Sequence, residues 1–267
     1  MQVGVVVPAA GTSSRPGLGC KALVQLHGRS SLARVVELFS SLDEVDRIVV
    51  AAPGDLLEAA RREVRSAAPR REVLVCPGGD SRQASVRAAL GALGPCDYVL
   101  VHDATRPLVS AALVRRVLAA AAQAGAAMPG VMPREAVKRV GGERLLESID
   151  RQRLMLAQTP QAFRRQQLVR AHFEAADAGL FGEDDAQLVA AAGHEVAVVE
   201  GEATNVKLTR PEDVELLEGL VRAQEARRSA AAPPPAETPA ATVRPPDASR
   251  LGAVDRIPTP GESAPRQ

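Results

Sequence analysis

Hydrophobic positions follow two alternating patterns over most of the chain. Short runs of apolar, often β-branched residues, typical of buried parallel strands, recur at 3–8, 47–51, 72–76, 98–101 and 195–199. Between these runs, apolar residues repeat at helical spacing, which predicts helices at 31–42, 55–66, 82–90, 110–124, 165–178, 184–192 and 211–227. This alternation predicts an α/β fold, with a Rossmann-like, mostly parallel sheet and helices on both faces.

The alternation is interrupted between residues 132 and 150. Two short strand-like pieces, at 137–140 and 145–149, flank Gly141-Gly142, which is a hairpin signal. An isolated two-stranded hairpin is marginally stable in water, so this one is expected to pack on something else. A second subunit is a reasonable candidate, and we therefore expect a homodimer.

The C-terminal residues 229–267 differ in composition from the rest. They hold nine of the chain's 20 prolines and many alanines, without apolar periodicity. Such a segment cannot bury enough apolar surface to order itself. We expect one catalytic domain at 1–228, with the hairpin as an arm at about 132–150, followed by a disordered Pro/Ala-rich tail at 229–267.

Composition excludes several classes of function. A net charge of +1, 2% aromatic residues and no Trp argue against nucleic-acid binding. The three cysteines, Cys20, Cys76 and Cys96, lack metal-site spacing and read as thiols of a reducing compartment. The sequence shows neither a signal peptide nor an apolar run long enough to span a membrane. These features predict a cytoplasmic protein without a membrane or nucleic-acid partner.

Lysine is rare in this chain. Of 33 basic residues only three are lysines, namely Lys21, Lys138 and Lys207. Where a generic positive charge suffices, the chain has arginine, so a retained lysine indicates a position that needs a compact, flexible ammonium group.

The first strand runs into a segment suited to phosphate. It ends in Pro8-Ala9-Ala10-Gly11, and the cations Arg15 and Lys21 follow. Ligands of open α/β sheets bind at the carboxyl ends of strands, where small residues let backbone N–H groups approach phosphate oxygens. The segment matches neither the dinucleotide fingerprint nor the P-loop pattern. We interpret it as a cradle for a nucleoside triphosphate.

Three further segments carry candidate chemistry. The turn containing Gly79, Asp80 and Ser85 opens a helix, where it serves either as an ordinary capped turn or as a site for a base or ribose. Asp103 ends the strand at 98–101 and is a natural Mg²⁺ ligand beside a triphosphate. Lys207 lies just before the last predicted helix.

These segments, in this order, resemble the 2-C-methyl-D-erythritol 4-phosphate cytidylyltransferase family of the non-mevalonate isoprenoid pathway. The resemblance runs from about residue 3 to 221. It rests on the motifs PAAG with a following Arg and Lys, GGDSRQASV, VHDATRP, TPQAF, EDDA and NVKLTRPED. All six in order are specific for this family or for the related ribitol-5-phosphate cytidylyltransferases.

The resemblance implies transfer of CMP from CTP to a sugar-alcohol phosphate with Mg²⁺ as cofactor and release of pyrophosphate, by a homodimer whose 132–150 arm reaches the partner's active site. It implies that the CTP-binding residues are Ala9, Ala10, Gly11, Gly79, Asp80, Ser85 and Asp103, with Asp103 also the metal ligand. It implies that the catalytic residues are Arg15, Lys21, Arg151 and Lys207. The implied acceptor-binding residues are Arg106, Glu135, Lys138, Arg151, Thr159 and Lys207.

Two departures from the family pattern keep alternatives open. Cys20 stands where the family has Pro before the first lysine, and Glu135-Ala136 stands where it has Asp-Thr. The second departure falls on the acceptor side. Another polyol phosphate, such as ribitol 5-phosphate, is therefore the second candidate acceptor, and a non-catalytic nucleotide-binding paralogue is the alternative from another class. A dehydrogenase is disfavoured because the glycine fingerprint is absent.

Overall fold

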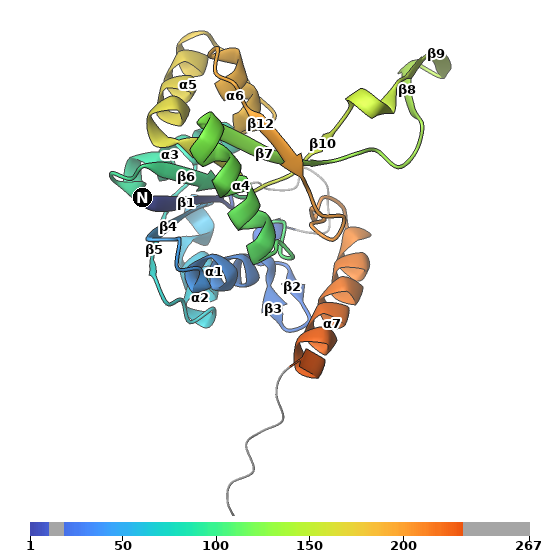
Figure 1. Cartoon of the computed structure of the whole chain (residues 1–267). Helices are drawn as coiled ribbons and strands as arrows, with labels where there is room; N and C mark the ends of the chain where they lie inside the picture. The colour runs from blue at the N-terminus through green and yellow to red at the C-terminus, as the bar shows by residue number, and fades with distance from the viewer. Residues whose placement is uncertain (11–18, 232–267) are drawn as a thin grey trace, which may run out of the picture.

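The computed structural model describes residues 1–10 and 19–231, with side chains described as far as Arg227. Among these residues, eight strands form one central sheet (Figure 1). They are β1 (Val3–Pro8), β4 (Arg47–Ala52), β5 (Glu72–Pro77), β6 (Tyr98–Val101), β7 (Ala126–Val131), β10 (Leu156–Ala157), β11 (Gln161–Arg164) and β12 (Ala197–Glu200). Their order is β10-β7-β11-β6-β1-β4-β5, and β12 also pairs with β7.

The sheet is mostly parallel, as predicted. β1 pairs in parallel with β4 and β6, β4 with β5, and β12 with β7. The exceptions are β11, which runs antiparallel between β6 and β7, and β10, which is antiparallel to β7.

Helices cover both faces of the sheet, which confirms the predicted layers. On one face lie α1 (Ser31–Ser41), α2 (Leu57–Ser66) and α4 (Ala111–Ala124). On the other lie α3 (Arg82–Leu93), α5 (Arg165–Asp177) and α6 (Asp185–Ala191). Several helices begin at a side chain that accepts a backbone N–H, as Ser110 does from Leu113 at the start of α4. Short 3-10 helices, η1 (Lys21–Leu23), η2 (Gly54–Leu56) and η3 (Arg151–Arg153), lie in the connections.

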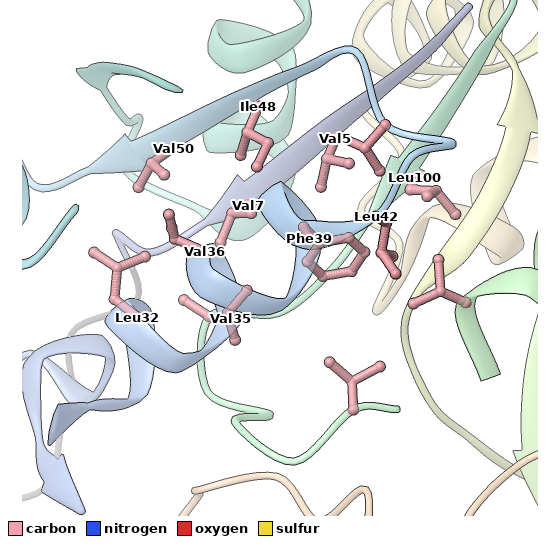
Figure 2. Packing of buried hydrophobic residues seen from close by; sticks show 14 of the residues in the cluster. Val5, Val7, Leu32, Val35, Val36, Phe39, Leu42, Ile48, Val50 and Leu100 are labelled. Carbon is pink, nitrogen blue, oxygen red and sulfur yellow. The ribbon is translucent and has the colours of Figure 1, made fainter. Parts of the chain in front are cut away.

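The apolar stripe of α1 forms the centre of one core. Figure 2 shows its side chains directed at residues of β1, β4 and β6, with Phe39 the largest of them. Phe39 is fully buried, as are Val5, Ile48 and Leu100 of the facing strands. The strand side chains alternate between the two faces, so Val5 and Val7 enter this core while Val6 enters the opposite one.

The sequence pattern missed three strands on one side of the sheet. β7 contains Pro129 and Gly130, residues that normally argue against a central strand. β10 and β11 are only two and four residues long, too short to show a period. Their identity as strands depends on pairing with β6 and β7, which sequence periodicity does not report.

The predicted hairpin is present. β8 (Val137–Gly141) and β9 (Arg144–Ile149) pair with each other in antiparallel fashion, with a register shift at Arg139/Val140. The pair extends away from the body of the protein (Figure 1). Its apolar side chains are largely exposed, at 63% for Val140, 62% for Leu145 and 63% for Leu146. We call residues 132–150 the arm.

The last helix, α7 (Asp213–Ala231), packs on a small hairpin rather than on the sheet. Leu217 and Val221 of α7 are fully buried against Leu26 of β2 (Gln25–Leu26), which pairs with β3 (Arg29–Ser30). Leu108 and Leu208 complete this cluster, which we call the α7 cluster. α7 begins at Asp213, not at Pro211 as predicted, because the Asp213 carboxylate accepts the N–H groups of residues 209 and 210 and holds them in a turn.

No helix within the described residues is long and apolar enough to cross a membrane.

Candidate active site

A pocket lies at the carboxyl ends of β1 and β6. These strands are adjacent and parallel, with Val6 opposite Val101, so the residues that follow them reach the same edge of the sheet. The lining comes from segments far apart in the sequence. It consists of Pro8, Ala9, Lys21, Ala22, Arg82, Ser85, Asp103, Thr105, Lys207, Leu208 and Thr209.

Asp103 supplies a carboxylate to this lining, and cations surround it. Its Oδ1 accepts from Nε of Arg82 at 3.0 Å, and its Oδ2 lies 2.8 Å from Nζ of Lys207 and 3.8 Å from Nε of Arg106. Burial by itself would raise the pKa of Asp103. The opposing charges, chiefly Arg82 and Lys207, outweigh burial and hold the pKa of this carboxyl well below its usual range. Asp103 is therefore ionised at neutral pH.

A hydrogen-bonded chain behind Asp103 fixes its backbone. The Asp103 N–H donates to Oγ1 of Thr159 at 3.1 Å, and Thr159 Oγ1 lies 3.1 Å from Nδ1 of His102. His102 Nε2 lies 3.1 Å from the carbonyl oxygen of Arg106. A carbonyl only accepts, so Nε2 carries the proton and Nδ1 accepts from Thr159. Burial lowers the pKa of His102 to about 4, so it is neutral and structural.

Hydrogen bonds of the residues on either side of Lys207 fix its position. The Leu208 N–H donates to the Thr105 carbonyl, and the Asn205 side-chain amide donates to the Thr159 carbonyl, both at 2.8 Å. Arg106 Nη1 donates to the Asn205 carbonyl, also at 2.8 Å. The segment before α7 is therefore bound to the ends of β6 and β10, which brings the lysine to Asp103.

The turn after β5 is built for close approach. A Cβ atom on Gly78 would lie 2.6 Å from Cβ of Ala10, and one on Gly79 would lie 2.5 Å from Cβ of Ala84. The Gly79 N–H donates to Oγ of the buried Ser85 at 3.1 Å. Glycine at these positions lets the turn pack beside the end of β1.

The structure brings together many of the residues predicted from sequence. The predicted residues in the pocket lining are Ala9, Lys21, Ser85, Asp103 and Lys207. Ala10 and Gly79 adjoin the lining, Asp80 is exposed nearby, and Gly11 and Arg15 lie outside the described residues. Their assignment to CTP or catalysis stays a prediction.

The predicted acceptor residues are more dispersed within one chain. Arg106 and Glu135 line a second cavity, between β7, β10 and the base of the arm. Lys138 lies on the arm, where its Nζ donates to Oγ of Ser148 at 2.7 Å, and Arg151 of η3 donates to the Arg134 carbonyl. Neither belongs to the pocket lining of its own chain. Thr159 is buried with its hydroxyl already used twice, so its direct contact with an acceptor stays a prediction.

Sequence reasoning did not assign a role to Arg82, Thr105 or Thr209, which also line the pocket. Arg82 is the clearest omission, because it joins Asp103 to a second buried carboxylate, Asp185. Both residues lie in motifs that the sequence shows, GGDSRQASV and EDDA. Their pairing spans 103 positions of sequence, and no local pattern predicts it.

The described residues contain no group of three or more His, Cys, Asp or Glu side chains that could hold a metal ion unaided. Any cation bound at Asp103 therefore needs most of its ligands from substrate or water.

A mostly parallel α/β sheet with a cationic pocket at its strand ends is typical of proteins that bind phosphate groups, a class that includes the nucleotidyltransferases. The family model of 2-C-methyl-D-erythritol 4-phosphate cytidylyltransferase (IspD) matches residues 3–223. The chain belongs to this family, as its motifs predict.

Individual relatives agree with the family assignment. The chain is 41% identical over 224 residues to the 2-C-methyl-D-erythritol 4-phosphate cytidylyltransferase of Thermus thermophilus, covering 83% of this chain and 98% of the relative. The crystal structure of the Thermus thermophilus enzyme superimposes with a TM-score of 0.70 at 39% identity, covering 83% of this chain and all of that one. The bifunctional enzyme IspD/IspF of Desulforudis audaxviator is 42% identical over 219 residues, which are 81% of this chain and only 56% of that enzyme.

Proposed function

We propose that this protein transfers CMP from CTP to 2-C-methyl-D-erythritol 4-phosphate, giving 4-diphosphocytidyl-2-C-methyl-D-erythritol and pyrophosphate. The observation that carries the proposal is the pairing of Arg82 and Lys207 with the ionised Asp103 at the ends of β1 and β6, in a pocket that Lys21 also lines. Membership of the cytidylyltransferase family supports CTP as the nucleotide and 2-C-methyl-D-erythritol 4-phosphate as the acceptor.

The reaction needs charge stabilisation rather than a general base. An oxygen of the acceptor phosphate is already anionic, and it attacks the α-phosphorus of CTP in line while pyrophosphate leaves. The protein must bring two polyanions together and stabilise the additional charge of the transition state. Lys21 is assigned to the triphosphate because it follows the cradle, and Arg15 is expected to act with it. Lys207 and Arg151 are assigned to the acceptor phosphate.

Lys207 changes partners in this mechanism. In the free protein its ammonium group is paired with Asp103, while the side chain remains 42% exposed. A flexible lysine with this exposure can turn from the carboxylate to a phosphate, which arginine's flat, forked group does less readily. Pairing with Asp103 thus keeps the ammonium group of Lys207 close to the pocket until the substrates bind.

The residues of the pocket fit a magnesium ion. Mg²⁺ is commonly bound by one or two carboxylates together with substrate phosphates and water, and Asp103 supplies one ionised carboxylate at the right edge of the sheet. Asp103 would hold the ion, and its Oδ2 becomes available when Lys207 moves to a phosphate. Bound there, the ion would neutralise charge on the triphosphate.

A homodimer accounts for the dispersed acceptor residues. Lys138 and Glu135 lie on the arm and Arg151 follows it, away from the pocket of their own chain. The arm carries exposed apolar side chains that a partner subunit would cover. We assign the arm to dimerisation, with the acceptor site completed across the interface.

The remaining assignments come from composition. The unpaired thiols of Cys20, Cys76 and Cys96 support a reducing, cytoplasmic compartment. The Pro/Ala-rich residues 229–267 are assigned to a tail without a catalytic role.

The direct test is an acceptor assay. The full chain is incubated with CTP and Mg²⁺ and either 2-C-methyl-D-erythritol 4-phosphate or ribitol 5-phosphate, and pyrophosphate release is measured. We expect turnover with the first acceptor. Turnover with ribitol 5-phosphate alone would show that ribitol 5-phosphate is the acceptor. The departure from the family pattern at Glu135-Ala136, on the acceptor side, would agree with that result. CTP binding without pyrophosphate release from either acceptor would indicate a non-catalytic paralogue.

A further inference from the structure

A chain of hydrogen-bonded side chains runs from the pocket into the helical layer behind it. Asp103 Oδ1 accepts from Arg82 Nε at 3.0 Å, and Arg82 Nη1 donates to Oδ2 of Asp185 at 2.8 Å. The other oxygen of Asp185, Oδ1, lies 2.9 Å from Nε2 of His172. Because a carboxylate only accepts, Nε2 of His172 carries the proton. Arg82, Asp185 and His172 come from α3, α6 and α5, the helices of one face.

Asp185 and His172, the two residues of this chain farthest from Asp103, are buried and lie outside the pocket lining. The side chain of Asp185 is 1% exposed and that of His172 is 2% exposed, and neither lines the pocket. A buried carboxylate and its partner stabilise a fold only weakly, because both lose their contact with water, and apolar residues of similar volume often hold a core equally well. Packing between α5 and α6 alone therefore does not account for these residue types.

The positions of Asp185 and His172 fix the orientation of the Arg82 guanidinium group. Arg82 has Asp103 on its Nε side and Asp185 at Nη1, so two carboxylates from different elements fix the plane of its guanidinium group. His172 in turn fixes the carboxylate of Asp185 by holding its second oxygen. With Asp185 turned, Arg82 keeps only one anchor, and Asp103 loses a fixed partner at Oδ1.

We propose that Asp185 and His172 are positioning residues for the cytidylyl transfer, acting through Arg82 on Asp103. This inference rests on the proposed function, in which the pocket lined by Asp103 and Arg82 receives CTP. Asp185 and His172 touch no reacting atom. Their effect is to hold the guanidinium group and the carboxylate where CTP requires them.

Two substitutions interrupt the chain at different links. In Asp185→Asn, one carboxylate oxygen becomes an amide NH₂. This group faces either Arg82 or His172, both of which are donors, so one of the two hydrogen bonds is lost. His172→Phe keeps the ring volume and removes the donor to Asp185. Because each change loosens the anchor that holds the guanidinium group of Arg82, kcat/KM for CTP should fall about tenfold or more in each variant. KM for the acceptor should change less than about twofold, because neither link touches Lys207.

Matched variants separate positioning from general damage. His172→Gln should keep most of the activity that His172→Phe loses, because the amide nitrogen of glutamine can replace Nε2 as the donor to Asp185. His194→Gln is the control for a histidine on the same face, since His194 lies beyond α6 and outside this chain of contacts. Thermal unfolding of each variant is recorded beside the kinetics.

The decisive measurement is the effect of Asp185→Asn in an Arg82→Gln background. If Asp185 acts through Arg82, the loss of kcat/KM for CTP should largely disappear once Arg82 is replaced. An equal loss in both backgrounds, or single-variant losses no greater than that of His194→Gln, would refute the proposal.

Calorimetric titration with CTP and Mg²⁺ keeps this test independent of the acceptor. Wild-type protein that binds CTP but turns over no acceptor would refute the proposed function alone. The positioning proposal would then be decided by the Kd for CTP, which should rise about tenfold in Asp185→Asn and His172→Phe, and not in His194→Gln.

Discussion

At the scale of single residues, Lys21 and Lys207 are assigned to different phosphates, Lys21 to the triphosphate and Lys207 to the acceptor. Lys21 opens η1 just after the cradle, whereas Lys207 approaches from the segment before α7 and is paired with Asp103. The two ammonium groups reach one pocket from opposite ends of the sequence.

Lys21→Ala removes the cation assigned to the triphosphate. We expect kcat to fall by a factor on the order of 10²–10³, by analogy with the loss of one oxyanion donor. The measurement is steady-state pyrophosphate release at saturating CTP. Lys21→Arg is the companion variant, and it should recover only part of the rate because a guanidinium group does not fit a site built for an ammonium. A Lys21→Ala enzyme with unchanged kcat would contradict the assignment.

Lys207→Ala should act mainly on the acceptor. It removes the cation assigned to the acceptor phosphate, so KM for that substrate should rise more than KM for CTP. Initial rates over a grid of both substrate concentrations give the two constants. Equal losses of CTP and acceptor binding would count against the role given to Lys207.

His102 makes the stability of the protein depend on pH. Its pKa is lowered to about 4 in the folded protein, against about 6.5 in an unfolded chain. Between these values the unfolded state binds more protons, so the free energy of unfolding should decrease as the pH falls from about 6.5 to 4, by at most about 3 kcal/mol from this residue. Below pH 4, protonation of Asp103, whose pKa is also lowered, removes further stability.

Urea denaturation between pH 7 and pH 4, without nucleotide or metal ion, measures this dependence. His102→Gln should flatten it over the same interval. Parallel curves for the two proteins would show that another group is responsible.

Sequence motifs indicated several residues that the fold brings into one pocket, but not the contacts between them. Of the three rare lysines, Lys21 and Lys207 line the pocket with Asp103, whereas Lys138 lies on the arm. The links from Asp103 to Thr159 and from Arg82 to Asp185 did not follow, because they depend on side-chain directions set by the packed helices and strands. Contacts between distant segments leave no periodic trace in one sequence.

At the scale of elements, α7 stabilises the pocket from outside the sheet. Its Leu217 packs in the α7 cluster together with Leu26 of the small hairpin and Leu208, the neighbour of Lys207. His27 and Arg34 also pair with Glu225 of α7, at 2.7 and 3.0 Å. The helix thus joins the segments that carry Lys21 and Lys207, the two lysines of the pocket.

Leu217→Ala should cost about 2–5 kcal/mol of stability if the site does not collapse around the cavity. We also expect a larger loss of kcat at 37 °C than at 20 °C, because the segments of Lys21 and Lys207 lose a shared support. The control is Leu216→Ala, whose side chain is 53% exposed. A Leu217→Ala protein as stable as this control would disprove the packing role.

The pattern of hydrophobic residues predicted the elements that build the parallel half of the sheet. It failed where strands are short or contain breakers, as in β7 with Pro129 and in the two-residue β10. It predicted the hairpin of the arm from Gly141-Gly142, because turn chemistry is local. What the arm contacts is a property of a second molecule, which the periodicity of one chain does not encode.

At the scale of the whole molecule, the arm carries apolar side chains that the other described residues of the same chain leave exposed. Replacing both Leu145 and Leu146 by Asp puts charge on the surface assigned to the dimer interface. We expect a monomer of unchanged fold with an acceptor KM raised about tenfold or more, because burying an unpaired charge costs several kcal/mol. Analytical ultracentrifugation and acceptor kinetics measure the two effects.

Leu216→Asp makes the same chemical change on the exposed face of α7 and should leave the dimer intact. If the double arm variant sediments as wild type does, the arm is not the dimer contact.

The position of α7 has a further consequence for how the molecule opens. The two-residue strands β2 and β3 are too short to persist alone, so we expect their protection from hydrogen exchange to depend on packing against α7. Fraying of this one helix would release the supports of Lys21 and Lys207 while the sheet keeps its structure. We therefore expect the pocket to open with a smaller free energy than global unfolding, so that heat inactivates the enzyme before it melts.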